Sequence, residues 1–241
     1  MSTRDVIQDI VKHTAGLGYI SAVKITGNEN ETLLNAMDGD RTVILKAKLH
    51  NAVTELSGEF GLGNLGFLAG VTALPNYQEK DATVDVISRE RDGKSEPDHL
   101  LFKDPYGNND QYRFMSKEIV DQTLQTVRFK GADWDITFEP TKQKVSELQQ
   151  VAAIYGAIEP NFTVKTEGAS DGSFTGKRTF ASNIEGELKQ GYAWPLAQVL
   201  SILKLGMDGA CIMQISGKGA LQISVDSGIA KYDYILPAMS V

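Results

Sequence analysis

Cysteine is almost absent from this 241-residue chain, which contains only Cys211. A lone cysteine cannot form a disulfide within its chain, so the sequence lacks the cross-linked framework of small secreted domains. Cys211 lies inside a predicted strand. Because free cysteine is usually buried, we expect it to act as a small apolar side chain.

Residue patterns for metal binding and catalysis are also sparse. The three histidines, His13, His50 and His99, fall in separate predicted elements, and the chain has neither an HExxH nor a CxxC motif. The acidic residues are scattered rather than paired. We therefore predict no metal site, no cofactor and no catalytic residues, and we expect a protein that is not an enzyme.

Long apolar runs and a surplus of positive charge are missing too. No run approaches the ~20 residues that a helix needs to cross a bilayer, and residues 1–10 lack the apolar core of a signal peptide. These absences predict a cytoplasmic protein without membrane contact, located in the host cytoplasm if the protein is viral. The formal net charge of −7 argues against binding DNA through bulk positive charge, although basic residues can still gather on one surface.

The clearest structural pattern occupies residues 194–237. Leu196 and Val199 begin a helical repeat of apolar residues, and Pro195 and Gly206 suit the two ends of a helix. Strand-like runs, separated by glycine-containing turns, follow at 210–216, 220–226 and 229–236. This order predicts one helix followed by an antiparallel meander.

The same order of elements recurs along the chain. The predicted helices begin near residues 4, 64, 141 and 194, and locally paired strands follow each of them. Hydrophobic residues make up 41% of the chain, which supports a substantial core, and the length suits two domains of ordinary size. We predict an α+β protein with similar domains at 1–115 and 133–241, each with helices packed on antiparallel sheets, and a connector at 116–132.

A literal GxGxxG sequence at Gly61–Gly66 stands between a predicted strand at 53–60 and a predicted helix. In dinucleotide-binding folds such glycines let the backbone approach a pyrophosphate at a helix N-terminus. The residues that follow predict an antiparallel meander rather than the parallel crossover which that fold requires, so we favour a turn with close helix–strand packing. Two alternatives stay open: a nucleotide-binding enzyme that uses this turn, and a β-rich phage structural protein.

Basic residues mark the exposed faces of the predicted helices. They are Arg4, Lys12, Lys142, Lys144 and Lys204. If the helices share one side of their sheets, these cations and the glutamines between them form a single surface. Such a surface would contact phosphates without reading bases, which would allow the protein to slide along DNA.

Short segments of the sequence resemble the DNA sliding clamps of replication. Residues 227–238 resemble the closing strand of these clamps, where a turn, an apolar and aromatic strand and a terminal proline-containing step recur. Residues 65–71 and 147–150 are similar to helix segments of clamps from T-even-like bacteriophages, within the proliferating-cell-nuclear-antigen-like clamp superfamily.

The resemblance implies the DNA clamp fold and a homotrimer closed into a ring, with helices lining the hole and sheets outside. It implies a processivity factor that encircles double-stranded DNA and tethers a DNA polymerase, once an ATP-driven clamp loader has opened and placed the ring. The five basic residues above would face the DNA. A pocket for partner tails is expected near the connector and the C-terminus, lined by Val120, Leu124, Pro237 and Met239.

Overall fold

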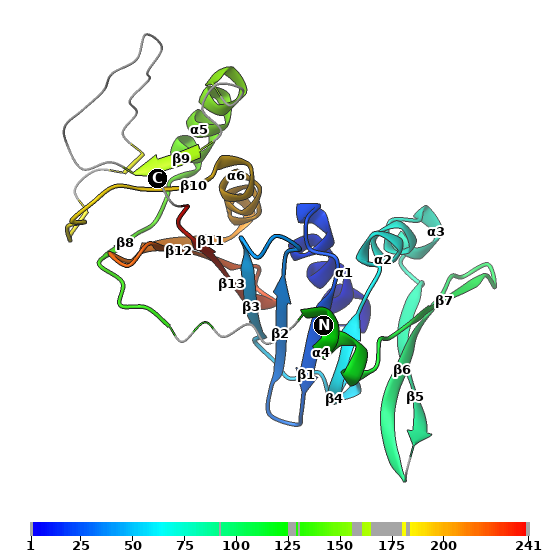
Figure 1. Ribbon diagram of the computed structural model, residues 1–241. Helices are drawn as coiled ribbons and strands as arrows, with labels where there is room; N and C mark the ends of the chain where they lie inside the picture. The colour runs from blue at the N-terminus through cyan, green and yellow to red at the C-terminus, as the bar shows by residue number, and fades with distance from the viewer. Residues whose placement is uncertain are drawn as a thin grey trace. The chain divides into compact units, whose positions relative to one another are not determined.

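The computed structural model describes residues 2–91, 93–124, 129, 131–155, 161–164, 180–181 and 184–239. The chain divides into two compact units (Figure 1). The first unit consists of Met1–Arg128 and Gly228–Tyr232, and the second of Phe129–Ser227 and Asp233–Val241. The domains predicted at 1–115 and 133–241, with a connector at 116–132, stay a prediction.

The first unit combines helices with two antiparallel sheets. Its helices are α1 (Thr3–His13), α2 (Leu65–Thr72), α3 (Pro75–Gln78) and α4 (Lys117–Leu124). Its strands are β1 (Val23–Gly27), β2 (Thr32–Met37), β3 (Ile44–Leu49), β4 (Gly58–Leu62), β5 (Thr83–Arg91), β6 (Lys94–Lys103) and β7 (Asn109–Arg113). Within this unit β4, β1, β2 and β3 lie side by side in that order, and β5, β6 and β7 form the second sheet.

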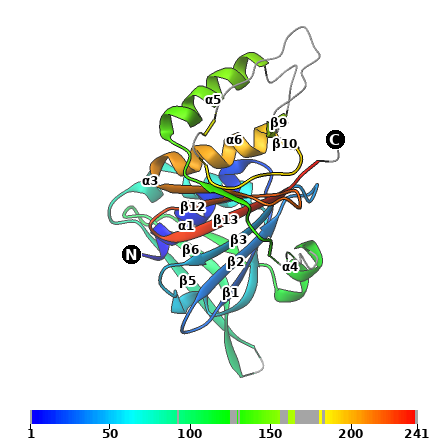
Figure 2. The same cartoon turned by 90° about the vertical axis from the view of Figure 1, so that its left-hand side faces the viewer.

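An N-terminal cap and a buried apolar face explain why α1 forms. Ser2 is the N-cap: its side chain accepts a hydrogen bond from the backbone N–H of Asp5, and the Asp5 carboxylate accepts one from the Ser2 backbone. These bonds lower the pKa of Asp5. The apolar face of the helix buries Val6, Ile7 and Ile10, and α1 contacts both α2 and β5. The two views in Figures 1 and 2 place α4 on the opposite side of the β4–β1–β2–β3 sheet from α1.

A buried polar cluster lies at the C-terminal end of α1. The His13 ring is only 2% exposed and stacks on Tyr232, with ring centroids 4.0 Å apart and planes 8° apart. The Tyr232 hydroxyl donates to Asp9 Oδ2 over 2.8 Å, and Asp9 Oδ1 lies 3.8 Å from His13 Nε2. Burial lowers the pKa of His13 from 6.5 to about 4, because desolvation of the charged ring outweighs the attraction of Asp9.

We expect the free energy of unfolding to decrease as the pH falls from 6.5 towards 4. The unfolded chain protonates His13 near pH 6.5 whereas the folded chain does so near pH 4, so acid favours the unfolded state across this window. At pH 5 the loss from this one group should be about 2 kcal/mol. Urea denaturation at pH 7 and pH 5 measures it, and His13→Gln should remove most of the difference. The matched change His50→Gln, at an exposed histidine, should retain it.

The second unit repeats the combination of helices and antiparallel strands. Its helices are α5 (Lys142–Tyr155) and α6 (Leu196–Leu205), which contact each other. Its strands are β8 (Ile136–Phe138), β9 (Asn161–Val164), β10 (Tyr192–Pro195), β11 (Ala210–Ile215), β12 (Ala220–Asp226) and β13 (Ala230–Pro237). The strands β13, β12, β11 and β8 are neighbours in that order, and β9 pairs with β10. Half-buried Cys211 lies in β11, and burial raises the pKa of its thiol to about 11.

Two sequence predictions differ from the structure in the first unit. The strand predicted at 53–60 is partly wrong, because Thr54–Leu56 form a 3-10 turn that buries Leu56 completely and β4 begins only at Gly58. The predicted connector is also more ordered than its weak pattern indicates, since Lys117–Leu124 form α4. Among the helices that the structure describes, none is long and apolar enough to cross a membrane.

Candidate nucleic-acid and partner interfaces

The five predicted DNA-facing cations lie on three helices. Arg4 and Lys12 are on α1, Lys142 and Lys144 on α5, and Lys204 in the last turn of α6. Lys12, Lys142 and Lys204 are exposed, and the other two are half-buried. Lys144 forms an ion pair with Glu147 on the next turn, with 2.9 Å between Nζ and Oε2, so part of its charge is offset within α5. Exposed cations on helices are suited to phosphate contacts that ignore sequence.

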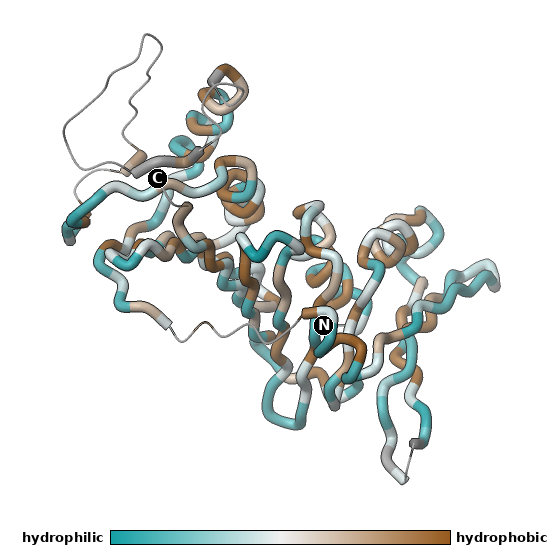
Figure 3. Tube along the Cα trace, in the orientation of Figure 1, coloured by the Kyte–Doolittle hydropathy of each residue, from teal (hydrophilic) through white to brown (hydrophobic). Residues whose placement is uncertain are grey.

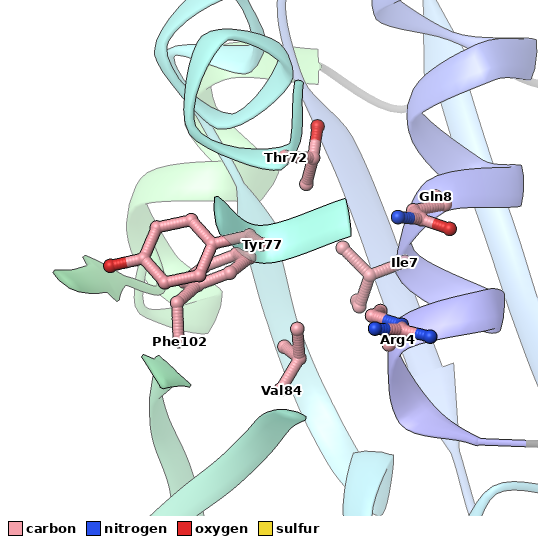
Figure 4. Close-up of a pocket in the computed structure, with 7 residues that line it drawn as sticks. All are labelled: Arg4, Ile7, Gln8, Thr72, Tyr77, Val84 and Phe102. Atoms are coloured by element: carbon pink, nitrogen blue, oxygen red, sulfur yellow. The ribbon is translucent and has the colours of Figure 1, made fainter. Parts of the chain in front are cut away.

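Arg4 also has a role inside the first unit. Its Nη1 donates to the backbone carbonyls of Glu79 and Ala82, over 2.7 and 3.0 Å, and so ties α1 to the segment before β5. Figure 4 shows the Arg4 side chain at the edge of a small crevice, near Ile7 of the same helix and Val84 of β5. An arginine bound to two carbonyls has less freedom to reach a phosphate, and its assignment to the DNA-facing surface stays a prediction.

The helix α2 presents no cation to solvent. Its sequence, LGFLAGVT, contains no charged residue, and Phe67 is half exposed at 50%. Leu74, just beyond the helix, is 41% exposed. Large exposed apolar side chains close together are typical of contact surfaces.

The glycines of the GxGxxG sequence serve close packing. Gly61 lies in β4, which pairs antiparallel with β1, and a Cβ at Gly61 would come within 2.7 Å of the Val120 side chain. A Cβ at Gly63 would clash with the Met115 sulfur. The first turn of α2 follows Asn64, whose φ of 49° is left-handed. This geometry matches the preferred interpretation of close packing, and a strand paired antiparallel lacks the parallel crossover of a dinucleotide fold.

An open hollow of about 380 Å³ lies between α2 and β7. It is lined by Gly63, Asn64, Phe67, Gln111, Tyr112, Arg113 and Met115. The ring of Phe67 stacks near that of Tyr112, with centroids 6.4 Å apart, and the buried Tyr112 hydroxyl donates to the Gly63 carbonyl. That hydrogen bond holds the Tyr112 ring in place at the bottom of the hollow. The exposed ring of Phe67 lines one side.

One edge of β7 is unpaired beside this hollow. The backbone N–H of Phe114 donates to the Asp98 carbonyl, so alternation directs the backbone groups of Asn109, Gln111 and Arg113 away from β6. Within the described part of the chain, these outward groups have no hydrogen-bond partner. Figure 3 shows β7 as a mostly hydrophilic strand, which is typical of an exposed edge. A free edge next to an aromatic hollow is suited to accept an extended segment from another chain.

The four residues of the predicted partner pocket have different environments. In the first unit, Val120 and Leu124 are buried, at 0% and 8% exposure, and pack with Ala22. In the second unit, Pro237 is exposed, and the half-buried Met239 donates its backbone N–H to the Ala193 carbonyl over 2.9 Å. Val120 and Leu124 are therefore occupied by the chain itself, and their role in a partner pocket stays a prediction.

Side chains that could hold a metal ion do not gather anywhere in the described residues. No group of three or more histidine, cysteine, aspartate or glutamate side chains there has a suitable arrangement.

Comparison with solved structures identifies the fold. The structure matches PCNA from Thermococcus kodakaraensis with a TM-score of 0.65 and 12% identity, over 99% of this chain and 98% of that one. It matches A. fulgidus PCNA, solved with the C-terminal region of FEN-1 bound to it, with a TM-score of 0.66 and 12% identity, over 100% and 97% of the two chains. No family model matches the sequence, and no curated protein matches it by sequence. The α+β clamp fold predicted from the sequence is thereby confirmed, and this chain has the fold of PCNA.

Proposed function

We propose that this protein is a sliding clamp that encircles double-stranded DNA and tethers a DNA polymerase. The match to PCNA over nearly the full length of both chains carries the proposal. The net charge of −7 suits enclosure, because a ring need not bind DNA tightly in order to stay on it. Such a ring requires an ATP-dependent clamp loader to open it, and we infer that a loader acts on this chain. The short resemblances at 65–71 and 147–150 favour a clamp of the T-even-like phage type.

We infer that three copies close the ring and that the free edge of β7 forms one side of each contact. A strand from a second copy would pair with Gln111 and Arg113 and place an apolar side chain in the hollow beside Phe67. A contact between two different surfaces can repeat from one copy of the chain to the next. The copies close into a ring when the rotation between neighbours brings the last copy back to the first. Because each chain has two similar units, three copies would place six units around the ring.

Partner proteins are the second part of the proposal. A. fulgidus PCNA is solved with the C-terminal region of FEN-1 bound to it, so a clamp of this fold can accept a terminal segment of another protein. By analogy we infer that the polymerase and the loader each present such a segment to this chain. The exposed Pro237 at the end of β13 and the neighbouring Met239 are candidates for that contact.

Replacing Lys142 and Lys204 together with alanine should weaken contact with DNA and leave the fold intact. Both side chains are exposed, so their removal should cost little stability. Each lysine that contacts a phosphate should contribute about 1 to the slope of log K against log salt concentration. Fluorescence anisotropy with duplex DNA across a salt series measures that slope. The control changes Lys103 and Lys218, which are exposed by 51% and 77%, and it should behave like the parent.

The decisive experiment tests topological linkage to DNA. Light scattering should first give a species at three times the chain mass of 26.3 kDa, without larger polymers. After loading by the cognate loader, labelled protein should stay on nicked circular DNA through a high-salt wash and leave once the circle is cut. Protein retained equally on cut DNA would contradict a clamp. Open polymers would favour the phage structural protein, and a thermal shift with NAD would favour the nucleotide-binding enzyme.

A further inference from the structure

The strands β5 and β6 continue as a two-stranded ribbon beyond the sheet that they form with β7. β7 pairs with β6 only at residues 99–103, whereas β5 and β6 stay paired as far as Arg91 and Lys94. Figure 1 shows this ribbon extending past β7. Val84 and Phe102 are opposite each other and buried, so they mark the inner face of the sheet. The other face, which we call the outer face, is directed away from the core.

A β-bulge at the base of the ribbon places Asp98 between the three strands. The register shifts after Ile87, and Asp98 is the residue of β6 left without an opposite residue on β5. A bulge of this kind directs a side chain out of the regular alternation. Asp98 Oδ1 lies 3.1 Å from Arg89 Nε on β5 and 3.4 Å from Arg113 Nη2 on β7. One carboxylate oxygen thus holds two guanidinium groups that come from different strands.

The two arginines bring more positive charge and more hydrogen-bond donors than Asp98 can satisfy. His99 Nδ1 lies 2.9 Å from Asp98 Oδ2, and this contact and the arginine charges lower the pKa of Asp98. The ionised carboxylate offsets one guanidinium charge of two. Arg89 binds through Nε and Arg113 through Nη2, and their other N–H groups have no partner among the described residues. The arginine side chains are 50% and 74% exposed, so these donors are open to solvent.

Alternation along the ribbon adds basic positions to the same face. Side chains two residues apart on a strand share a face, so Arg89 and Arg91 both belong to the outer face. Arg91 is opposite Lys94, and Arg89 is opposite Glu96. Glu90 falls on the other face of the ribbon. A chain with a net charge of −7 therefore has one ribbon face on which basic positions outnumber acidic ones.

We propose that this outer face, centred on Arg89 and Arg113, is a binding site for nucleic-acid phosphates, separate from the cations on the helices. A guanidinium group presents its N–H donors in a planar fork that matches two oxygens of a phosphate. Because one carboxylate already orients both groups, less conformational entropy is lost when a phosphate binds. The donors reach phosphate oxygens rather than base edges, so binding will not depend on base sequence.

The extended shape of the ribbon favours a nucleic-acid strand over a single small anion. Such a strand carries a charge at every nucleotide, so it can engage the two arginines and the basic positions further along the ribbon together. The inference does not depend on ring closure, since every residue that carries it belongs to the first unit.

A covalently closed circle of double-stranded DNA is the direct probe, because a closed protein ring cannot thread it without a loader. Fluorescence anisotropy with a labelled circle gives the slope of log K against log salt concentration. Arg89→Gln with Arg113→Gln should lower that slope by about 2, since each cation on a phosphate contributes about 1. The control, Lys48→Gln with Lys218→Gln, removes the same charge at side chains that are 61% and 77% exposed, and it should keep the parent's slope.

Three results would overturn the proposal. The first is a parent protein that does not bind the circle at low salt, and the second is a folded arginine variant with the parent's slope. The third is a variant that loses binding to labelled polyglutamate but not to the circle, which would assign the face to acidic protein segments. Circular dichroism and the melting temperature establish that each variant is folded.

Chemical modification of the unaltered chain serves if the arginine variant does not fold. Phenylglyoxal reacts with exposed arginines, and mass spectrometry locates the products. The DNA circle should slow the modification of Arg89 and Arg113 and leave that of Arg41, which is exposed between β2 and β3, unchanged. Modification of all three at the same rate with and without DNA would contradict a phosphate site on this face.

Discussion

Replacing Phe67 with aspartate should leave a folded chain that stays monomeric at concentrations where the parent should form the proposed ring. Phe67 is 50% exposed in the single chain, beside the hollow and the free edge of β7. In the proposed contact this ring is buried against a second copy, and aspartate would place an unpaired charge there. Losing an aromatic anchor of an interface costs about 2–4 kcal/mol, which corresponds to a dissociation constant about 30- to 900-fold higher at each contact.

Sedimentation velocity across a concentration series measures the effect. The control is Tyr106→Asp, which introduces the same charge at a 73% exposed aromatic residue in the turn between β6 and β7 and should assemble like the parent. Circular dichroism and the melting temperature must match the parent in both variants, so that loss of assembly is not loss of fold. If Phe67→Asp still forms the parent's oligomer, the interface does not include the proposed contact at Phe67 and β7. That result would not exclude a ring.

Local pattern predicted the C-terminal part of the chain well. The helix expected from Pro195 to Leu205 is Leu196–Leu205, and the strands expected at 210–216, 220–226 and 229–236 are Ala210–Ile215, Ala220–Asp226 and Ala230–Pro237. These elements have regular apolar spacing and glycine-containing turns, so the signals that define them lie within a few residues of each other. Tertiary contacts did not have to overrule them.

The helix α4 shows what local pattern misses. Val120, Leu124 and Val127 give only a partial helical repeat, and the sequence therefore predicts a connector at 116–132. The helix forms because Gly61, almost sixty residues earlier, leaves room for Val120 and because Lys24 and Glu59 bind the charges of Lys117 and Asp121. Docking of this kind joins residues distant in sequence, so the pattern of apolar residues within 116–131 cannot predict it.

Some residues of the candidate surfaces could be predicted from the sequence, and others could not. The cations on α1, α5 and α6 could be read from helical spacing, and the structure places Lys12, Lys142 and Lys204 at exposed positions. The second role of Arg4 could not be predicted from helical spacing, because its carbonyl partners at Glu79 and Ala82 depend on the tertiary fold. Phe67 was also missed as a surface residue. In an apolar run such as LGFLAGV, spacing does not separate the one exposed aromatic residue from its buried neighbours.

Replacing Trp194 with alanine should destabilise the second unit by about 3–5 kcal/mol. Trp194 is fully buried, with its ring centroid 6.5 Å from that of Phe162 and 6.0 Å from that of Tyr192. Its Nε1 donates to the Leu236 carbonyl over 3.1 Å, which links β10 to β13. Alanine would leave a cavity among these rings and a buried carbonyl without its donor, so both effects act in the same direction.

Urea denaturation followed by circular dichroism measures this loss, and two transitions are expected if the units unfold separately. Trp194→Phe separates the two causes: it keeps most of the ring volume and loses the hydrogen bond, so it should cost about 1–2 kcal/mol. Trp194→Ala with the stability of the parent would show that β10 does not anchor this unit. Because α6 begins immediately after β10, loosening Trp194 should also displace Lys204, and the variant should lose the proposed DNA contact at temperatures where its first unit is still folded.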